Sequence, residues 1–342
     1  MRRDQNILIA ISILIVAFIS GLSLGMLILS GASDQGVGGN TYICLDEGDI
    51  NAAIDDIGTG KGTIVIYQNI TITSTLRING EGDYLIEGVG LHFLTSNALD
   101  ISLARSCIIR NLFLEGISPN YLIRIANYKN YPVRLENLKI ISKTEYSGVG
   151  ISVNSDNVWI LDCQIQNFDE GIYIYSGVSR VTIQSCDFSH LSSAAFNVRG
   201  VYNEIRDNTI TDCRFAVFLS NNNNNNRILD NDISDYTDQG IYLLSSDNNL
   251  ITGNYIHDNG LSDYDSDAIF IGGYSDINLM INNYLKNLNL LDAGDVAYGI
   301  RFSGSYHEYN VVTNNIFHDV EIAINGANAT DIVTDNTIIT SP

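Results

Sequence analysis

A short unit that recurs about every 23 residues constrains the fold of this chain more than any other feature. In each copy Asn or Cys follows an apolar residue at short distance, and a second apolar residue comes soon after it. Ten copies are found, centred on Asn111, Asn137, Cys163, Cys186, Asn208, Asn231, Asn254, Asn283, Asn315 and Asn336. Such a repeat predicts a solenoid, because one unit cannot bury its apolar side until neighbouring units stack on it.

A second element lies between these units and stays in phase with them. It is a small residue followed by a strand with apolar residues at alternate positions: Gly150-Ile151, Gly171-Ile172, Ala195-Phe196, Ala216-Val217, Gly240-Ile241, Ala268-Ile269, Gly299-Ile300 and Ala323-Ile324. A unit of about 23 residues accommodates three short strands and their turns. The leucine signature of leucine-rich repeats is absent, and a propeller blade needs about forty residues. We therefore predict an all-β parallel β-helix of about a dozen coils over residues 43–342.

The repeated Asn is typical of a turn, where stacked amides form hydrogen bonds from coil to coil. The first two units place their apolar residues one step differently, so their turn is expected to differ. Cys163 and Cys186 occupy the same position as the Asn residues and are expected to be buried neighbours. The five cysteines show no CxxC pair and no spacing to His, so they predict no zinc site.

Residues 49–57 have the pattern of a short amphipathic helix, in front of the segment from Gly58 to Ile66. A β-helix has open ends with unpaired strand edges, and a helix laid over one end would protect them. We predict that residues 49–57 cap the first coil. The carboxyl end offers no comparable segment.

The amino terminus predicts export. Residues 1–6 read as a cytoplasmic tail, 7–30 as an apolar transmembrane signal anchor, and 31–42 as a linker. Two arginines before the apolar segment place the tail inside and the β-helix outside the cytoplasm, as a single-pass protein of the cell membrane. Cleavage of a signal sequence after Ala32 is the alternative. In that compartment Asn69 and Asn328, both within N-x-Thr sequons, are candidate glycosylation sites.

The formal net charge of −21 argues against nucleic acid as a partner, because duplex binding depends on Lys and Arg neutralising phosphates. The acidic surface instead suits solubility or the recruitment of cations.

The opening Asp49-Ile50-Asn51-Ala52-Ala53-Ile54 and the repeated N-x-I and G-I-x-I coils resemble the pectate-lyase-like superfamily over residues 43–342. This resemblance implies a right-handed, single-stranded parallel β-helix. The superfamily includes polysaccharide lyases, hydrolases, epimerases, tailspikes and surface proteins. Signature motifs of its polygalacturonases and mannuronan epimerases are missing, so no catalytic residue can be transferred by motif.

The alternating strand has an outward row as well as an inward one. We expect this outward row to contain Ser152, Tyr173, Asn197, Phe218, Tyr242, Phe270, Arg301 and Asn325. Exposed rings on a flat sheet can stack against sugar rings, or they can merely cover one another. The candidate substrate-binding residues are Tyr173, Asn197, Phe218, Tyr242, Phe270 and Arg301.

The two longest coils carry their extra residues just before this strand, at 259–267 and 287–298. Long loops often carry function. Four aspartates there are candidate calcium ligands: Asp263, Asp265, Asp267 and Asp295. The D-x-D-x-D spacing is not an EF-hand, because Ala268 replaces the turn glycine. The superfamily resemblance implies that Arg301 would contact a uronate carboxylate or act as the base, whereas the simpler role is counter-ion to the loop.

Three hypotheses about function follow. The first, which we favour, is a membrane-anchored β-helix that binds polysaccharide or glycan along one exposed sheet, with calcium as a candidate cofactor. The second is a polysaccharide lyase or hydrolase that uses the 259–301 loops, with Arg301 as its candidate catalytic residue. The third is a structural envelope or adhesion protein without enzymatic activity.

Overall fold

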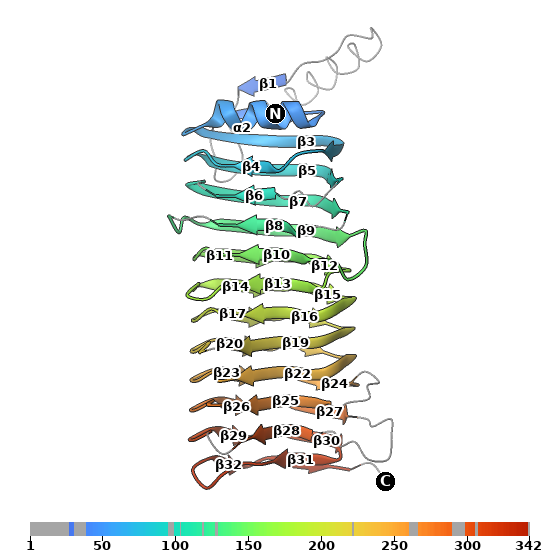
Figure 1. Cartoon of the computed structure of the whole chain (residues 1–342), viewed down its shortest axis with the longest axis vertical. Helices are drawn as coiled ribbons and strands as arrows, with labels where there is room; N and C mark the ends of the chain where they lie inside the picture. Colours follow the sequence, from blue (N-terminus) through green and yellow to red (C-terminus); the bar gives the residue numbers. More distant parts are fainter. Residues whose placement is uncertain are drawn as a thin grey trace, which may run out of the picture.

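The computed structural model describes residues 27–30, 39–94, 99–102, 104–117, 120–126, 129–220, 222–259, 266–288, 298–304 and 307–340. Over these residues short strands wind into a straight stack of about twelve coils, and each strand pairs with its equivalent one coil away (Figure 1). The pairings between coils are parallel, with neighbouring strands in register, as Ile172 with Phe196 and Val217 with Ile241. The predicted parallel β-helix is confirmed.

One side of the stack, which we call sheet B, contains the alternating strands that follow each small residue. It has eleven strands: β4 (Leu76–Ile78), β6 (Leu99–Ile101), β8 (Tyr121–Ile125), β10 (Val149–Val153), β13 (Glu170–Ile174), β16 (Leu191–Val198), β19 (Cys213–Ser220), β22 (Tyr236–Leu244), β25 (Asp267–Gly272), β28 (Tyr298–Ser303) and β31 (Ile322–Asn325).

The other 22 strands form sheet A, which is continuous in the first coils and bent into two rows in the later ones. The first coils use β1 (Leu27–Ser30), β2 (Asn40–Cys44), β3 (Lys61–Ile72), β5 (Asp83–Phe93), β7 (Ser106–Gly116) and β9 (Val133–Ser142). The first row is β11 (Val158–Leu161), β14 (Val181–Gln184), β17 (Glu204–Arg206), β20 (Arg227–Leu229), β23 (Leu250–Thr252), β26 (Leu279–Ile281), β29 (Val311–Thr313) and β32 (Ile332–Thr334). The second row is β12 (Gln164–Gln166), β15 (Asp187–Ser189), β18 (Thr209–Ile210), β21 (Asp232–Ile233), β24 (Tyr255–His257), β27 (Tyr284–Leu288), β30 (Ile316–Val320) and β33 (Thr337–Ile339).

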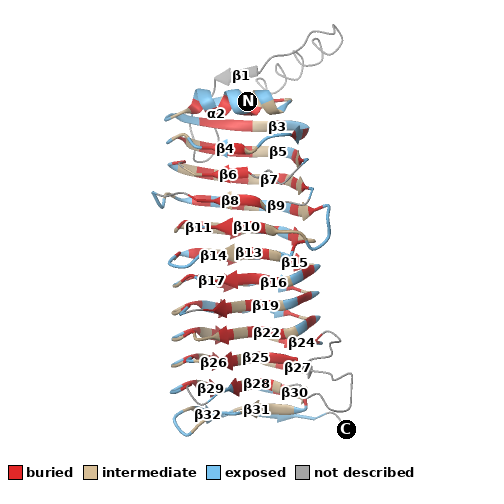
Figure 2. Cartoon of the chain, viewed as in Figure 1, coloured by how far each residue is buried: buried red, intermediate tan, exposed pale blue. Residues whose placement is uncertain are grey.

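The core is a column of apolar side chains along the axis, visible as buried segments in the coils that precede the last one (Figure 2). In the eight sheet B strands from β10 to β31, the small residue lies where another coil approaches closely. A Cβ on Gly171 would lie 2.7 Å from the carbonyl oxygen of Ala195, and one on Gly299 would lie 2.5 Å from the Phe317 ring. Tight packing at these two glycines therefore excludes larger side chains.

The bend between the two rows of sheet A is made by the repeated Asn. The residue before it adopts a left-handed backbone, as at Asp207 (φ 56°) and Asp230 (φ 52°). Asn231 is 1% exposed, and its Oδ1 accepts hydrogen bonds from the backbone N–H and the Nδ2 of Asn208. Because Asn and Asp tolerate this backbone, the turn recurs in each later coil.

The first two units differ as expected. Asn111 and Asn137 themselves have positive φ, at 53° and 48°, and their side chains are exposed and joined by a 2.8 Å hydrogen bond. Cys163 and Cys186 are buried and unpaired, and the backbone N–H of Cys163 lies 3.4 Å from Cys186 Sγ. Their prediction as buried neighbours is confirmed.

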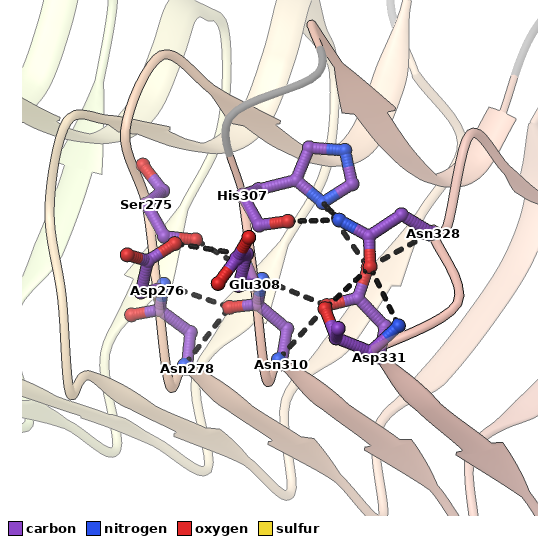
Figure 3. A network of polar contacts seen from close by, with 9 residues as sticks. Ser275, Asp276, Asn278, His307, Glu308, Asn310, Asn328 and Asp331 are labelled. Carbon is purple, nitrogen blue, oxygen red and sulfur yellow. Dashed lines mark hydrogen bonds and ion pairs between the residues drawn. The ribbon is translucent and has the colours of Figure 1, made fainter.

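A second asparagine ladder, which the sequence analysis missed, lies five residues before the first. Its rungs are Asn203, Asn226, Asn249, Asn278 and Asn310, and Asp331 occupies the last rung. Figure 3 shows how this end is completed. Asp331 accepts two hydrogen bonds from Asn310, and Asn328 Nδ2 donates to the carbonyl oxygen of His307. Asn328 thus supplies the amide donor that a carboxylate lacks.

At the amino end, α2 (Glu47–Ile57) lies over the first coil, with Ile50, Ala53, Ile54 and Ile57 buried toward the core (Figure 1). The sequence predicts this helix at 49–57. Asp46 begins the helix as its N-cap, because its side chain accepts a hydrogen bond from the backbone N–H of Asp49 at 2.9 Å.

Residues 1–26 and 31–38, which hold most of the expected anchor and linker, lie outside the described residues. Within the described ranges, no helix is long and apolar enough to cross a bilayer. Leu27–Ser30 belong to β1, which pairs antiparallel with β2, so the expectation that the helix extends to residue 30 was wrong for these four residues. The free edge of β2 offers backbone hydrogen bonds that favour an extended partner there.

Candidate functional site

The outward row of sheet B runs in register along the stack. Tyr173 pairs with Asn197, Asn197 with Phe218, Phe218 with Tyr242, Tyr242 with Phe270, and Phe270 with Arg301. Ser152 precedes this series and Asn325 follows it. The structure thus brings all six candidate substrate-binding residues into one line on neighbouring coils.

Three rings of this line touch one another and form a continuous aromatic strip. The centroids of Phe218 and Tyr242 lie 5.0 Å apart, and those of Tyr242 and Phe270 lie 4.9 Å apart at an interplanar angle of 88°. Phe215, on the same strand as Phe218, stacks on it at 5.5 Å and widens the strip. The aromatic strip is Phe215, Phe218, Tyr242 and Phe270, and the three residues of the outward row are each only partly buried.

The hydroxyl group of Tyr242 remains protonated near neutral pH. Burial raises its pKa, and the nearby Asp238 carboxylate acts in the same direction. A neutral phenol can donate a hydrogen bond at the edge of an apolar ring. Tyr242 therefore combines a stacking face with a polar group.

Arg301 lies at the far end of the aromatic strip and is held from two sides. Its Nε lies 3.0 Å from Asp267 Oδ2, and its guanidinium lies 4.9 Å from the Phe270 centroid and 5.1 Å from that of Tyr298. The Asp267 side chain is fully buried and that of Arg301 is 23% exposed. This arrangement favours the counter-ion role of Arg301 over that of a mobile base.

The predicted calcium ligands separate into two groups. Asp267 is buried against Arg301. Asp263, Asp265 and Asp295 lie outside the described residues. Among the residues that are described, no group of three or more His, Cys, Asp or Glu side chains is arranged to hold a metal ion. Calcium binding by the loops remains a prediction.

A polar pair lies at the near end of the aromatic strip. Asn197 Nδ2 donates to Glu170 Oε1 at 2.6 Å, from one coil to the previous one. Burial raises the pKa of Glu170, while the Asn197 hydrogen bond and Arg199 lower it and Asp169 raises it. The guanidinium of Arg199 lies 5.2 Å from the centroid of the Tyr173 ring.

The sequence analysis missed Glu170, Phe215 and Tyr298. All three immediately precede the small residue of their strand, and they are in register with one another through Ala194, Gln239 and Asp267. This position also faces outward, because the strand carries two consecutive buried residues, such as Gly171 and Ile172, before alternation resumes. The residue that precedes each small residue in the sequence could have identified this second outward position.

A hollow lies elsewhere, on sheet A. It has a volume of about 420 Å³ and is located where the continuous strands give way to the two rows. Its lining residues are Asn111, Leu112, Phe113, Asn137, Leu138, Lys139, Asp162, Cys163, Gln164, Ser185 and Asp187. Only one aromatic side chain, Phe113, lines it, so it offers less stacking surface than the strip.

The two sequon asparagines occupy different environments. Asn69 is exposed on β3. Asn328 Oδ1 accepts from both the N–H and the hydroxyl of Thr330, and its Nδ2 bonds to the His307 carbonyl. Their glycosylation remains a prediction, with Asn69 the more accessible acceptor.

Comparison with known families identifies the family of this β-helix. The profile of a family described as right handed beta helix region matches residues 74–245 and 147–338, which is most of the chain. The chain belongs to this family. Its β-helix is accordingly right-handed, as the sequence resemblance implied.

Several solved β-helices share this fold at low sequence identity. A tailspike protein of E. coli bacteriophage HK620 has a TM-score of 0.66 at 12% identity over 86% of this chain and 63% of that chain. A PL6 family polysaccharide lyase from Pseudopedobacter saltans has a TM-score of 0.61 at 14% identity over 86% and 92%. A periplasmic alginate epimerase has a TM-score of 0.60 at 11% identity over 89% and 85%. These matches show the β-helix fold alone, and the comparison with curated proteins found no match.

Proposed function

We propose that this β-helix protein binds a polysaccharide along the outward row of sheet B. The observation that carries the proposal is the aromatic strip, in which Phe218, Tyr242 and Phe270 follow one another in register on three coils. A sugar ring presents an apolar C–H face that packs on an aromatic ring, while its hydroxyls need polar groups beside it. The strip supplies rings, and Asn197 and Arg301 lie at its two ends.

The length of the outward row between Asn197 and Arg301 suits a polymer better than a single sugar. From Asn197 to Arg301 there are four coil steps, which at roughly 4.8 Å per step amount to about 19 Å. Of the proteins that share the fold, one is named as a polysaccharide lyase, one as an alginate epimerase, and a variant of the HK620 tailspike is described in complex with a hexasaccharide. These names support a glycan as the partner class.

The purified domain, tested against neutral and acidic polysaccharides, should bind at least one of them through the strip. We expect Phe218→Ala and Tyr242→Ala each to weaken binding by about tenfold or more, because central aromatic contacts dominate such interfaces. Affinity is measured by calorimetry or interferometry, with circular dichroism to show that the variants fold.

Two matched controls locate the site. Tyr255→Ala removes a partly buried aromatic ring from sheet A, and Phe113→Ala removes the ring from the hollow. Both should retain the wild-type affinity. Loss of binding in Phe113→Ala with full binding in Phe218→Ala would transfer the site to the hollow and refute the proposal.

The lyase or hydrolase alternative is tested in the same samples by measuring product release with calcium and with a chelator. Turnover that Arg301→Ala abolishes in a folded protein would establish the enzyme. Binding without product supports the glycan-binding role. Absence of both would favour the structural protein.

Anchoring through residues 7–26, with the β-helix outside the cytoplasm, completes the proposal and is supported by the sequence pattern. Protease added to intact cells should digest the β-helix of a membrane-bound protein. Protection of the domain in intact cells, or its recovery free of the membrane fraction, would contradict the anchored arrangement.

A further inference from the structure

The outward side of sheet B has two polar bridges of the same geometry, one at each end of the aromatic strip. In each, a carboxylate that precedes the small residue of one strand meets the outward-row residue of the next coil. Glu170 meets Asn197 in this way, and Asp267 meets Arg301. The two ends therefore differ in chemistry although the backbone that holds them is the same.

At the Arg301 end the charges balance within the protein. The fully buried Asp267 carboxylate faces the guanidinium at 3.0 Å, and the rings of Phe270 and Tyr298 pack against it. A ligand carboxylate would have to compete with Asp267 for this cation, which is held in place by an ion pair already desolvated.

At the Glu170 end one buried hydrogen-bond acceptor has no partner among the described residues. Asn197 is 6% exposed, and its Oδ1 has no hydrogen-bond partner among the residues that the structure describes. The opposite amide orientation would set this oxygen against Glu170 Oε1, two acceptors facing each other, so the hydrogen bond fixes the assignment. Buried acceptors without a partner are rare and call for an explanation.

Aromatic and charged side chains surround the pair formed by Glu170 and Asn197. Tyr173 and Phe218 flank Asn197 in register on either side. Arg199 lies over the Tyr173 ring, and Asp169 accepts a hydrogen bond from Ser192 at 2.6 Å. The Asn197 Oδ1 is an acceptor without a partner among the described residues, and the carboxyl oxygens of Glu170 beside it are acceptors as well.

We propose that Glu170 and Asn197 form a subsite that accepts hydrogen bonds from sugar hydroxyl or N-acetyl N–H groups, and that the glycan is therefore neutral at this position. Two acceptors attract donors and repel a carboxylate or sulfate, whose oxygens are acceptors themselves. The Asn197 oxygen is enclosed in the free protein, so the ligand reaches it by displacing the flanking Tyr173 or Phe218 ring. This inference rests on the proposed glycan binding along the strip and specifies its substrate class.

The test uses the polysaccharide that binds best and its partner differing only at C6, where one has a hydroxyl and the other a carboxylate. Wild-type protein should bind the hydroxyl form at least about tenfold more tightly. Glu170→Gln removes the negative charge while keeping an acceptor, and should raise affinity for the carboxylate form about tenfold with little change for the hydroxyl form. Asn197→Leu should weaken binding of the hydroxyl form about tenfold in a folded protein.

The outcomes separate this inference from the proposed function. Tighter wild-type binding of the carboxylate form would overturn the inference. So would unchanged affinities in Glu170→Gln and Asn197→Leu alongside lost binding in Phe218→Ala, although glycan binding by the strip would then stand. If Phe218→Ala also left binding unchanged, the proposed site itself would fall.

Discussion

A single side chain in the first asparagine ladder makes several hydrogen bonds at once. Asn231 Oδ1 accepts two from Asn208, and Asn231 Nδ2 donates to the carbonyl oxygen of Ile205 and to Asn254 Oδ1. Asn231→Leu removes these partners and leaves buried donors and acceptors unpaired. We expect the free energy of unfolding to fall by about 3 kcal/mol, measured by urea denaturation.

The end of the same ladder provides the control. Asn336 is partly exposed, and its groups accept from Asn315 and donate to Val312 only. Asn336→Leu should cost markedly less, because solvent can replace its partners. Equal losses at the two positions would show that ladder bonds do not determine the effect.

Glu170 makes stability depend on pH in a predictable direction. Burial raises its pKa above the ordinary value of 4.5, so the charged carboxylate is less favourable in the folded protein than in the unfolded chain. This contribution to stability is complete below the unfolded-state pKa and is lost as pH rises through the folded-state pKa. Glu170→Gln should therefore have the melting temperature of the wild type near pH 4 and a higher one near pH 8.

Melting curves over this pH range provide the measurement. The exposed Glu145 serves as the matched position, and Glu145→Gln should shift the melting temperature little at any pH. A gain for Glu170→Gln that is as large at pH 4 as at pH 8 would contradict the prediction.

The sequence predicts the features that follow from the repeat period. It misses contacts that join different positions on two neighbouring coils. The Asn repeat was predictable from its period of about 23 residues, and the outward row from the alternation within each strand. The bridge between Glu170 and Asn197 was not, because it joins two different positions on neighbouring strands. The second ladder was visible as an Asn five residues before Asn231, and also before Asn254, but its role required the turn geometry.

At the scale of elements, the stability of α2 depends on its N-cap residue, Asp46. Asp46→Ala removes the side chain that accepts from the Asp49 N–H, and we expect a loss of about 1 kcal/mol in unfolding free energy. Asp55→Ala, on an exposed position of the last turn, should change stability much less. Thermal denaturation of both variants measures the difference, and equal effects would show that the cap does not stabilise this end.

The helix pattern at 49–57 was readable because its apolar residues recur at helical spacing. The apolar segment that ends in Leu27–Ser30 gave no such guidance. Its composition suits a helix in a bilayer, yet these four residues pair with β2. Hydrophobicity alone does not distinguish the two when an unpaired strand edge lies within reach.

For the whole molecule, the two ends of the stack differ. At the carboxyl end Ile332, Val333 and Ile338 are 53%, 42% and 64% exposed, although Val333 and Ile338 continue rows that are buried in earlier coils. We expect Val333→Ser with Ile338→Ser to reduce concentration-dependent association of the 342-residue chain, measured by sedimentation velocity. Ile117→Ser, at an exposed position along the side of the stack, should leave association unchanged.

The parallel order of coils also governs how the chain can be built. From the second coil on, each new coil finds its pairing partner in the coil synthesised just before it, and the first coil already has α2 over it. During translation, therefore, each coil that leaves the ribosome can pair with a coil that has already folded. This pairing does not depend on residues that are still to be synthesised. A chain halted part-way through synthesis would hold a shorter stack of native coils, with the outward row of sheet B shortened by the same number of steps.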